Sequence, residues 1–239
     1  MIISENIILW CNSNSGFLSL LLFTISIILG IISGFFKSII RKPRLKIRII
    51  DKMTFYSFYY TGENYYNKQL NENFKYHKTG FVLYLSIANV GNQNTSIDKI
   101  WLGYKKNYNK SKLFRKNKYQ WLAQSNIVNN FEIKFNDVNS LTINNLRLKN
   151  DVFDNSAHSS LDVGNSMVGI AYFEQESAWG NLNPKPNKDH STDVILKIKD
   201  INDKNYKFKI NLKQIPIDEA RKYNEDFGDF ESIFRGKRA

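Results

Sequence analysis

The residues best suited to chemistry are seven basic side chains between Tyr104 and Tyr119, a stretch that contains no acidic residue and has aromatic residues interleaved. Lysine and arginine neutralise phosphates and aromatic rings stack on bases, so the stretch could bind a nucleotide or a nucleic acid. It could equally lie on an anionic membrane, or be a solvated hairpin loop. The basic residues are Lys105, Lys106, Lys110, Lys112, Arg115, Lys116 and Lys118.

A second group of lysines lies in the last hairpin that the sequence predicts. If the alternating apolar residues of 194–198 and 206–212 face a core, the lysines between them share the opposite face, with no acid among them. Like charges on one sheet face repel each other, which an anionic partner would relieve. Lysines also protect an exposed strand from pairing with other chains. These residues are Lys197, Lys199, Lys207, Lys209 and Lys213.

Catalytic and metal-binding motifs are missing from the sequence. It contains no G-x-S-x-G, G-x-G-x-x-G, G-K-[ST] or H-E-x-x-H pattern. The histidines, His77, His158 and His190, lack the spacing of metal ligands, and a single cysteine, Cys11, excludes a disulfide framework. We therefore expect a protein that is not an enzyme and needs no cofactor or metal.

The long polar segment 174–191 contains Trp179 beside a glycine, followed by two prolines. Long loops of this kind are usually functional or disordered. Trp179 is a candidate ligand lid or partner anchor. The alternative is that it packs over one end of the domain.

An uncharged apolar run at residues 16–36 determines where the rest of the chain lies relative to a membrane. Fourteen of its 21 residues are Leu, Ile or Phe, and a helix of this length spans about 30 Å, the thickness of a bilayer core. It is too long for the core of a cleavable signal peptide. No lysine or arginine precedes it, whereas seven follow within residues 37–52. Positive charge marks the cytoplasmic side, so the sequence predicts a single-pass inner-membrane protein of a bacterium, with its N-terminus outside and its main domain cytoplasmic.

Small residues in this run recur every fourth position, at Ser26, Gly30 and Gly34. On a continuous helix they share one face, and small residues at this spacing let two helices approach closely. We expect this face to support association of two copies of the chain, although Gly and Ser are common in such helices anyway.

The remainder of the chain has the two-residue periodicity of β-strands and hardly any helical pattern. Apolar runs predict strands at 45–49, 53–60, 81–87, 95–104, 131–135, 167–173, 194–198 and 206–212. The polar stretch 62–78 predicts a long loop. Together they predict an all-β domain, an antiparallel β-sandwich of immunoglobulin-like type or a barrel, preceded by one transmembrane helix.

Five segments follow from these patterns. They are a short extracytoplasmic segment (1–15), the transmembrane helix (16–36), a basic juxtamembrane linker (37–43), the β domain (44–215) and a C-terminal tail that is a short helix or disordered (216–239). The sequence of residues 83–104, LYLSIANVGNQNTSIDKIWLGY, resembles that of immunoglobulin-like bacterial domains. This resemblance concerns the fold alone. The overall layout is similar to that of membrane-bound antiphage effectors that sense a cyclic nucleotide.

The function we expect is that of a membrane-anchored, non-enzymatic binding or interaction module. The net charge of +12 favours anionic partners. The expected partners are the lipid bilayer and anionic headgroups, and a second copy of the chain. A nucleotide is a further candidate, and nucleic acid is disfavoured. The alternative function is a ligand-gated effector, whose β domain senses an anionic nucleotide and drives association of the transmembrane helices.

Overall fold

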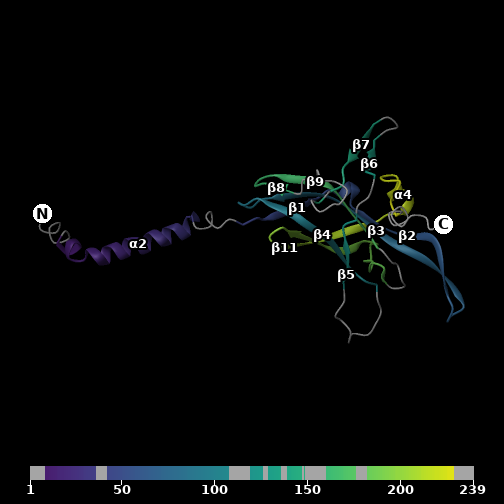
Figure 1. Ribbon diagram of the computed structural model, residues 1–239, viewed down its shortest axis with the longest axis horizontal. Coiled ribbons are helices and arrows are strands. Elements are labelled where there is room, and N and C mark those ends of the chain that lie inside the picture. Colours follow the sequence, from purple (N-terminus) through teal and green to yellow (C-terminus); the bar gives the residue numbers. More distant parts are fainter. Residues whose placement is uncertain are drawn as a thin grey trace.

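The computed structural model describes residues 9–35, 42–107, 119–125, 129–135, 139–146, 148, 160–175 and 182–228. These residues form one apolar N-terminal helix and a mostly β domain (Figure 1).

The helix is α2 (Ser15–Ile32), and none of its 18 residues is buried in the protein. Its mean hydropathy is 2.4, so by length and composition it could cross a membrane. The hydroxyls of Ser19, Thr24 and Ser26 donate to backbone carbonyls one turn earlier, at 2.8–2.9 Å. The helix therefore satisfies these polar groups internally, as a bilayer core requires.

Helix α2 ends before the last residue of the predicted small-residue face. Ser33 caps it, with its N–H donated to the Leu29 carbonyl at 2.8 Å, and Gly34 adopts a left-handed conformation with φ of 76°. Glycine takes this conformation without steric cost at a helix end. Gly34 therefore stands outside the helix, and only Ser26 and Gly30 remain four apart on one helical face.

Within the described residues, nine strands form one sheet. Its order is β1-β3-β2-β11-β10-β4-β5, with β9 paired to β3 and β8 paired to β4. A short 3-10 turn (Asp51–Met53) follows β1. The strands are β1 (Leu45–Ile49), β2 (Phe55–Asn67), β3 (Glu72–Asn89), β4 (Thr95–Lys105), β5 (Tyr119–Ala123), β8 (Ser160–Leu161), β9 (Ser166–Glu174), β10 (Thr192–Asp200) and β11 (Asn205–Gln214).

The sheet is mixed rather than antiparallel throughout, which corrects the sequence prediction. Strands β2 and β11 run parallel over two residue pairs, Lys213–Phe55 and Gln214–Tyr56, whereas the other pairings of this sheet are antiparallel. This short contact joins two groups of strands. We call β1, β2, β3 and β9 the first half-sheet, and β4, β5, β8, β10 and β11 the second half-sheet.

The main core takes its buried side chains from both half-sheets. Phe81, Leu83 and Leu85 come from β3, and Leu102 and Leu196 come from β4 and β10. Burying these apolar surfaces is the main driving force for folding. Because the two half-sheets share one continuous core, the sheet is folded over it.

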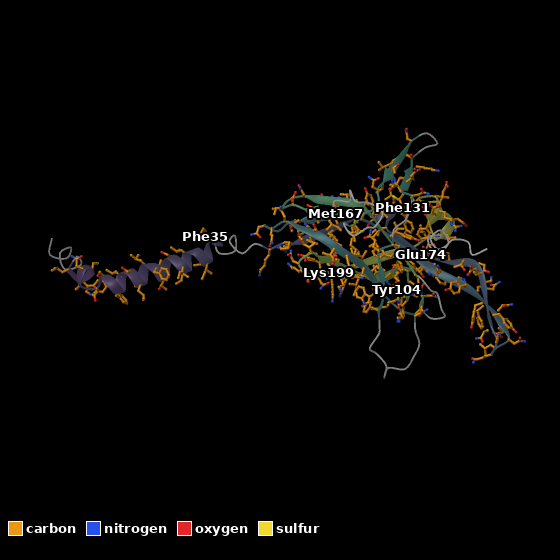
Figure 2. The ribbon with its side chains drawn as sticks, viewed as in Figure 1. Phe35, Tyr104, Phe131, Met167, Glu174 and Lys199 are labelled. Atoms are coloured by element: carbon orange, nitrogen blue, oxygen red, sulfur yellow. The ribbon has the colours of Figure 1, made fainter. Side chains whose placement is uncertain are left out.

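A second core lies on the outer face of the first half-sheet. Two elements cover that face: the hairpin of β6 (Phe131–Lys134) and β7 (Ser140–Ile143), and the C-terminal segment with helix α4 (Ile217–Arg221). Phe131 packs there together with residues of the C-terminal segment (Figure 2). Phe227 is fully buried against Gly80, where a side-chain Cβ would come within 2.6 Å of its ring. The C-terminal segment is thus part of the packed domain as far as residue 228.

The polar stretch 62–78, predicted to be a loop, is instead the outer part of a long hairpin. Strands β2 and β3 pair there, with a register shift between Tyr60 and Asn64 beside Gly62, whose φ is 89°. Strand β9 pairs with β3 only from Gly80 onward, so this part has one strand neighbour and no core. Both faces of this outer part are mostly exposed, and aromatic residues such as Tyr65, Tyr66 and Phe74 lie among polar ones, so the sequence shows no clear alternation of apolar and polar residues.

Candidate anionic-ligand surface

The outer face of the second half-sheet gathers lysine and tryptophan side chains. In an antiparallel sheet, directly paired residues point to the same face, and alternate residues of a strand point to opposite faces. The inward residues of β10, Val194, Leu196 and Ile198, are buried as the sequence predicted, so the residues between them face outward. We call this outer surface the lysine face: Lys99, Trp101, Lys105, Trp121, Lys197, Lys199, Lys207 and Lys209.

Lys197 occupies the centre of the lysine face. It lies directly opposite Lys207 on β11 and opposite Trp101 on β4. Two like charges in this position repel each other modestly. The Lys197 ammonium lies 4.6 Å from the centre of the Trp101 ring, a cation–π contact that stabilises one of the two charges.

Trp121 forms an aromatic platform on the same face, on the edge strand β5, with β4 between it and the strand of Lys197. It is paired with Gly103, and a Cβ on that glycine would come within 2.8 Å of the indole, so the ring lies against the backbone of β4. The residue is 41% exposed. Gly103 is in turn paired with Ile195, which is paired with Lys209. An exposed ring near ammonium groups can stack on a planar anionic ligand.

Lys199 differs from the other lysines because acids neutralise it. Its ammonium lies 2.5 Å from a carboxylate oxygen of Asp203 and 3.6 Å from one of Asp98. The hydrogen bond to Asp203 raises the pKa of Lys199 and lowers the pKa of Asp203. The prediction that no acid accompanies these lysines is therefore wrong at Lys199. Within the described part of the chain, Lys207 and Lys209 make no ion pair.

The structure places the start of the predicted basic stretch on the same half-sheet. Lys105, the last residue of β4, is paired with Tyr119, the first residue of β5, and Lys106 forms a β-bridge with Pro184. The stretch thus leaves and rejoins the sheet next to the lysine face. Trp179 lies outside the described residues. So do the remaining basic residues of the stretch, which are Lys110, Lys112, Arg115, Lys116 and Lys118.

A buried polar cluster lies on the other half-sheet, and the sequence analysis did not find it. The Lys78 ammonium lies 3.6 Å from the carboxylate of Glu174, whose side chain is 2% exposed (Figure 2). Tyr59 and Tyr172 donate hydroxyl hydrogen bonds to this carboxylate at 3.2 and 2.8 Å. Burial, reinforced by the Glu174 charge, raises the pKa of Tyr172 well above its usual value.

This cluster fastens the C-terminal segment to the first half-sheet. The Gly228 N–H donates to the Tyr172 hydroxyl at 3.3 Å, and the Gly228 carbonyl lies 3.3 Å from the Tyr59 hydroxyl. Phe227 packs on both tyrosine rings. The polar groups point at one another and at this segment, so we assign them a structural role. The sequence does not bring them together, because Tyr59, Lys78 and the pair Tyr172 and Glu174 come from three different strands, β2, β3 and β9.

A cavity of about 600 Å³ opens between the β6–β7 hairpin and the C-terminal segment. Three basic and three acidic side chains line it, among amide and hydroxyl groups. The charges balance, so the cavity selects no sign of ligand charge. In the described residues, no three His, Cys, Asp or Glu side chains gather as metal ligands would.

The chain was compared with family models, with curated proteins and with solved structures. No protein-family model matches it, and no curated protein matches it. Several solved structures align with it, among them the following two. One, from Bordetella pertussis, is described as an ApaA protein: it is 9% identical, the alignment covers 73% of this chain and 96% of that one, and the TM-score is 0.29. The other, a structural-genomics target, is 7% identical over 72% of this chain and 85% of its own, with a TM-score of 0.26. At these scores neither alignment informs fold or function.

Proposed function

We propose that this chain is a single-pass membrane protein whose β domain is a cytoplasmic, non-enzymatic binding module, and that the lysine face binds an anionic partner. The observation that carries the proposal is the open sheet surface that holds Lys197, Lys207 and Lys209 beside Trp101 and Trp121. Helix α2 serves as the anchor because of its length and apolar composition. The charge asymmetry around it supports the orientation.

The packing of two half-sheets on one core supports an immunoglobulin-like sandwich as the fold of this module. The parallel contact between β2 and β11 is a departure from an all-antiparallel version of that fold.

The lysine face suits a partner with several negative charges. Lys207 and Lys209 are exposed, and they alternate along one strand at a spacing of about 7 Å. Such a row can contact two phosphates at once. A bound anion also relieves the repulsion between the neighbouring ammonium groups.

A ligand-gated effector that senses an anionic nucleotide is the second candidate. The specific observation in its favour is the exposed Trp121 ring on the same face as the lysines, because stacking on a base requires an aromatic platform. Association of α2 through Ser26 and Gly30 would transmit the binding event.

The test uses the full chain in nanodiscs of neutral lipid. Its melting temperature is measured with inorganic polyphosphate, with cyclic dinucleotides and with anionic lipid vesicles, because a ligand that binds only the folded state stabilises it by RT ln(1 + [L]/Kd). We expect stabilisation by one of these that is lost in the variant K197Q/K207Q/K209Q.

The matched control is K46Q/K68Q/K188Q, which removes the same charge from exposed lysines elsewhere on the domain. Equal loss in both variants would reduce the effect to net charge. Stabilisation by a cyclic dinucleotide, but by neither polyphosphate nor vesicles, would favour the ligand-gated effector over the general binding module. No stabilisation by any of the three would refute ligand binding at the lysine face.

A further inference from the structure

Three turns at one end of the β domain each present an exposed aliphatic side chain. Val90 is 51% exposed, Val163 is 49% exposed and Ile201 is 61% exposed. They lie between β3 and β4, just before β9, and between β10 and β11. We call this surface the linker end.

Hydrogen bonds hold these turns together as one surface. The Gly164 N–H donates to the Asn89 carbonyl at 2.9 Å, and the Val163 N–H donates to the Asn94 side chain at 3.0 Å. The Ile201 N–H donates to the Ser96 carbonyl at 3.1 Å. The buried Asn89 amide further bonds the carbonyls of residues 93 and 161. The three aliphatic tips therefore keep fixed positions relative to one another.

The chain that arrives from the apolar helix is bound to the same end. The Lys42 N–H donates to the Asn92 side chain at 2.8 Å, and the Val90 N–H donates to the Arg44 carbonyl at 2.8 Å. The Pro43 carbonyl accepts from both the Lys204 ammonium and the Tyr206 hydroxyl, each at 3.0 Å. The linker is thus part of the domain from residue 42 onward.

The distance from this end to the apolar helix is short along the chain. Six residues, 36–41, separate Phe35 from Lys42. Seven steps of extended backbone span at most about 25 Å. The linker end therefore cannot move farther than that from the end of the apolar run.

The chemistry of the linker end fits the boundary between lipid and water. Separate aliphatic tips, unlike a continuous apolar groove, offer little area to a protein partner but can each enter the headgroup region. The exposed Lys42 and Arg44 beside them can pair with anionic headgroups. Asp162 is the acidic neighbour of Val163 and opposes this attraction locally.

We propose that the linker end rests on the bilayer surface, with Val90, Val163 and Ile201 inserted among the headgroups. This inference rests on the membrane anchorage proposed above. Strand β4 starts at this end and runs about 35 Å away from it. The domain then stands on the membrane, and Lys105, at the other end of β4, lies on the far side, where a soluble partner can reach it.

The test places an environment-sensitive fluorophore at single positions of the full chain, reconstituted in vesicles of equal parts phosphatidylcholine and phosphatidylglycerol. Cys11→Ser removes the native thiol, and Val163→Cys or Ile201→Cys supplies the label site. The control is Leu70→Cys, because Leu70 is 60% exposed at the opposite tip of the β2–β3 hairpin. Carbonate extraction of the same samples checks membrane insertion independently.

We expect blue-shifted emission and loss of most intensity to lipid-attached quenchers at 163 and 201, with neither change at 70. Replacing the two other tips with serine should abolish the quenching at 201 while the chain stays resistant to carbonate. Quenching at 163 and 201 no greater than at 70, in a chain that resists carbonate, would overturn the inference and leave the anchor intact. Energy transfer between labels on two copies, without lipid quenching, would assign the surface to a second copy and overturn it too. Release by carbonate would refute the anchor and the inference together.

Discussion

The two outer faces of the folded sheet are both built from β-strands, but one is covered by other parts of the chain and the other is open. On the first half-sheet the outward residues include Phe55, Val82 and Tyr172, and the chain covers them with the β6–β7 hairpin and the C-terminal segment. On the second half-sheet the outward residues include Lys197 and Lys207, and no described element covers them. Apolar surface must be buried to stabilise the fold, whereas lysine surface is stable in water. The covered face thus contributes stability, and the open face is free to serve a partner.

The largest effect should follow removal of the covering side chain. Phe227→Ala should lower the free energy of unfolding by about 3–5 kcal/mol, because a fully buried ring leaves a cavity over Gly80 and between the tyrosines. Denaturant titration of the full chain in detergent measures this. The comparison predicts that Lys209→Ala on the open face changes the same quantity by less than about 0.5 kcal/mol. Similar losses for both would show that the open face also stabilises the fold.

The buried ion pair should come next. Glu174→Gln removes the carboxylate charge that faces the buried Lys78 ammonium, which should cost about 3 kcal/mol. Adding Lys78→Met should restore part of the loss, since the ammonium that the Glu174 charge stabilises is then gone. Denaturation midpoints of the two single variants and the double variant give the coupling. Strict additivity would contradict the assigned pairing.

The contrast between the faces was only half visible in the sequence. The alternation of Val194, Leu196 and Ile198 with lysines predicted the open face, because two-residue periodicity in a strand reports one buried and one solvated side. Strand β9 of the first half-sheet is buried on both faces from Gly169 to Glu174, so it is a nearly continuous apolar run in the sequence. Such a run does not indicate which element covers it. Covering by Phe227 depends on a contact with Gly80 that is 147 positions away in the chain.

The lysine face, too, could be predicted only in part from the sequence. Lysines of neighbouring strands could be placed together from their periodicity. The tryptophans of β4 and β5 could not, because their place beside Lys197 and Lys209 depends on which strands are neighbours. The acids at Lys199 come from the β10–β11 turn and from a register irregularity near the start of β4, which no local pattern encodes. The long hairpin was missed because a ribbon without a core needs no apolar side.

Alkaline titration should separate tyrosines of the two regions. Burial raises the pKa of Tyr206 to about 12, and burial raises that of Tyr172 well above 10.0. A folded-state pKa above the unfolded value means that the stabilisation is complete below pH 10 and is lost as the pH rises toward 12. Phenolate absorbance should therefore show Tyr206 ionising near the top of this range, and Tyr206→Phe should remove that step. Tyr172 should ionise only as the protein unfolds; an early Tyr172 signal would contradict its burial under Phe227.

The smallest effect concerns repulsion across the open face. Lys207→Gln removes a charge that lies directly opposite Lys197, so it should raise the free energy of unfolding by about 0.2–0.5 kcal/mol. The cation–π contact with Trp101 already stabilises Lys197, at an exposed-site value of about 0.5–1 kcal/mol. In the background Trp101→Leu that contact is absent, and the gain from Lys207→Gln should be larger. A double-mutant cycle at low salt measures the difference, and it should shrink at high salt because the Debye length falls to about 3 Å at molar ionic strength. A loss of stability on Lys207→Gln would mean that the lysines of the open face stabilise the fold. It would contradict the conclusion that stability comes from the covered face and that the open face is free to bind a partner.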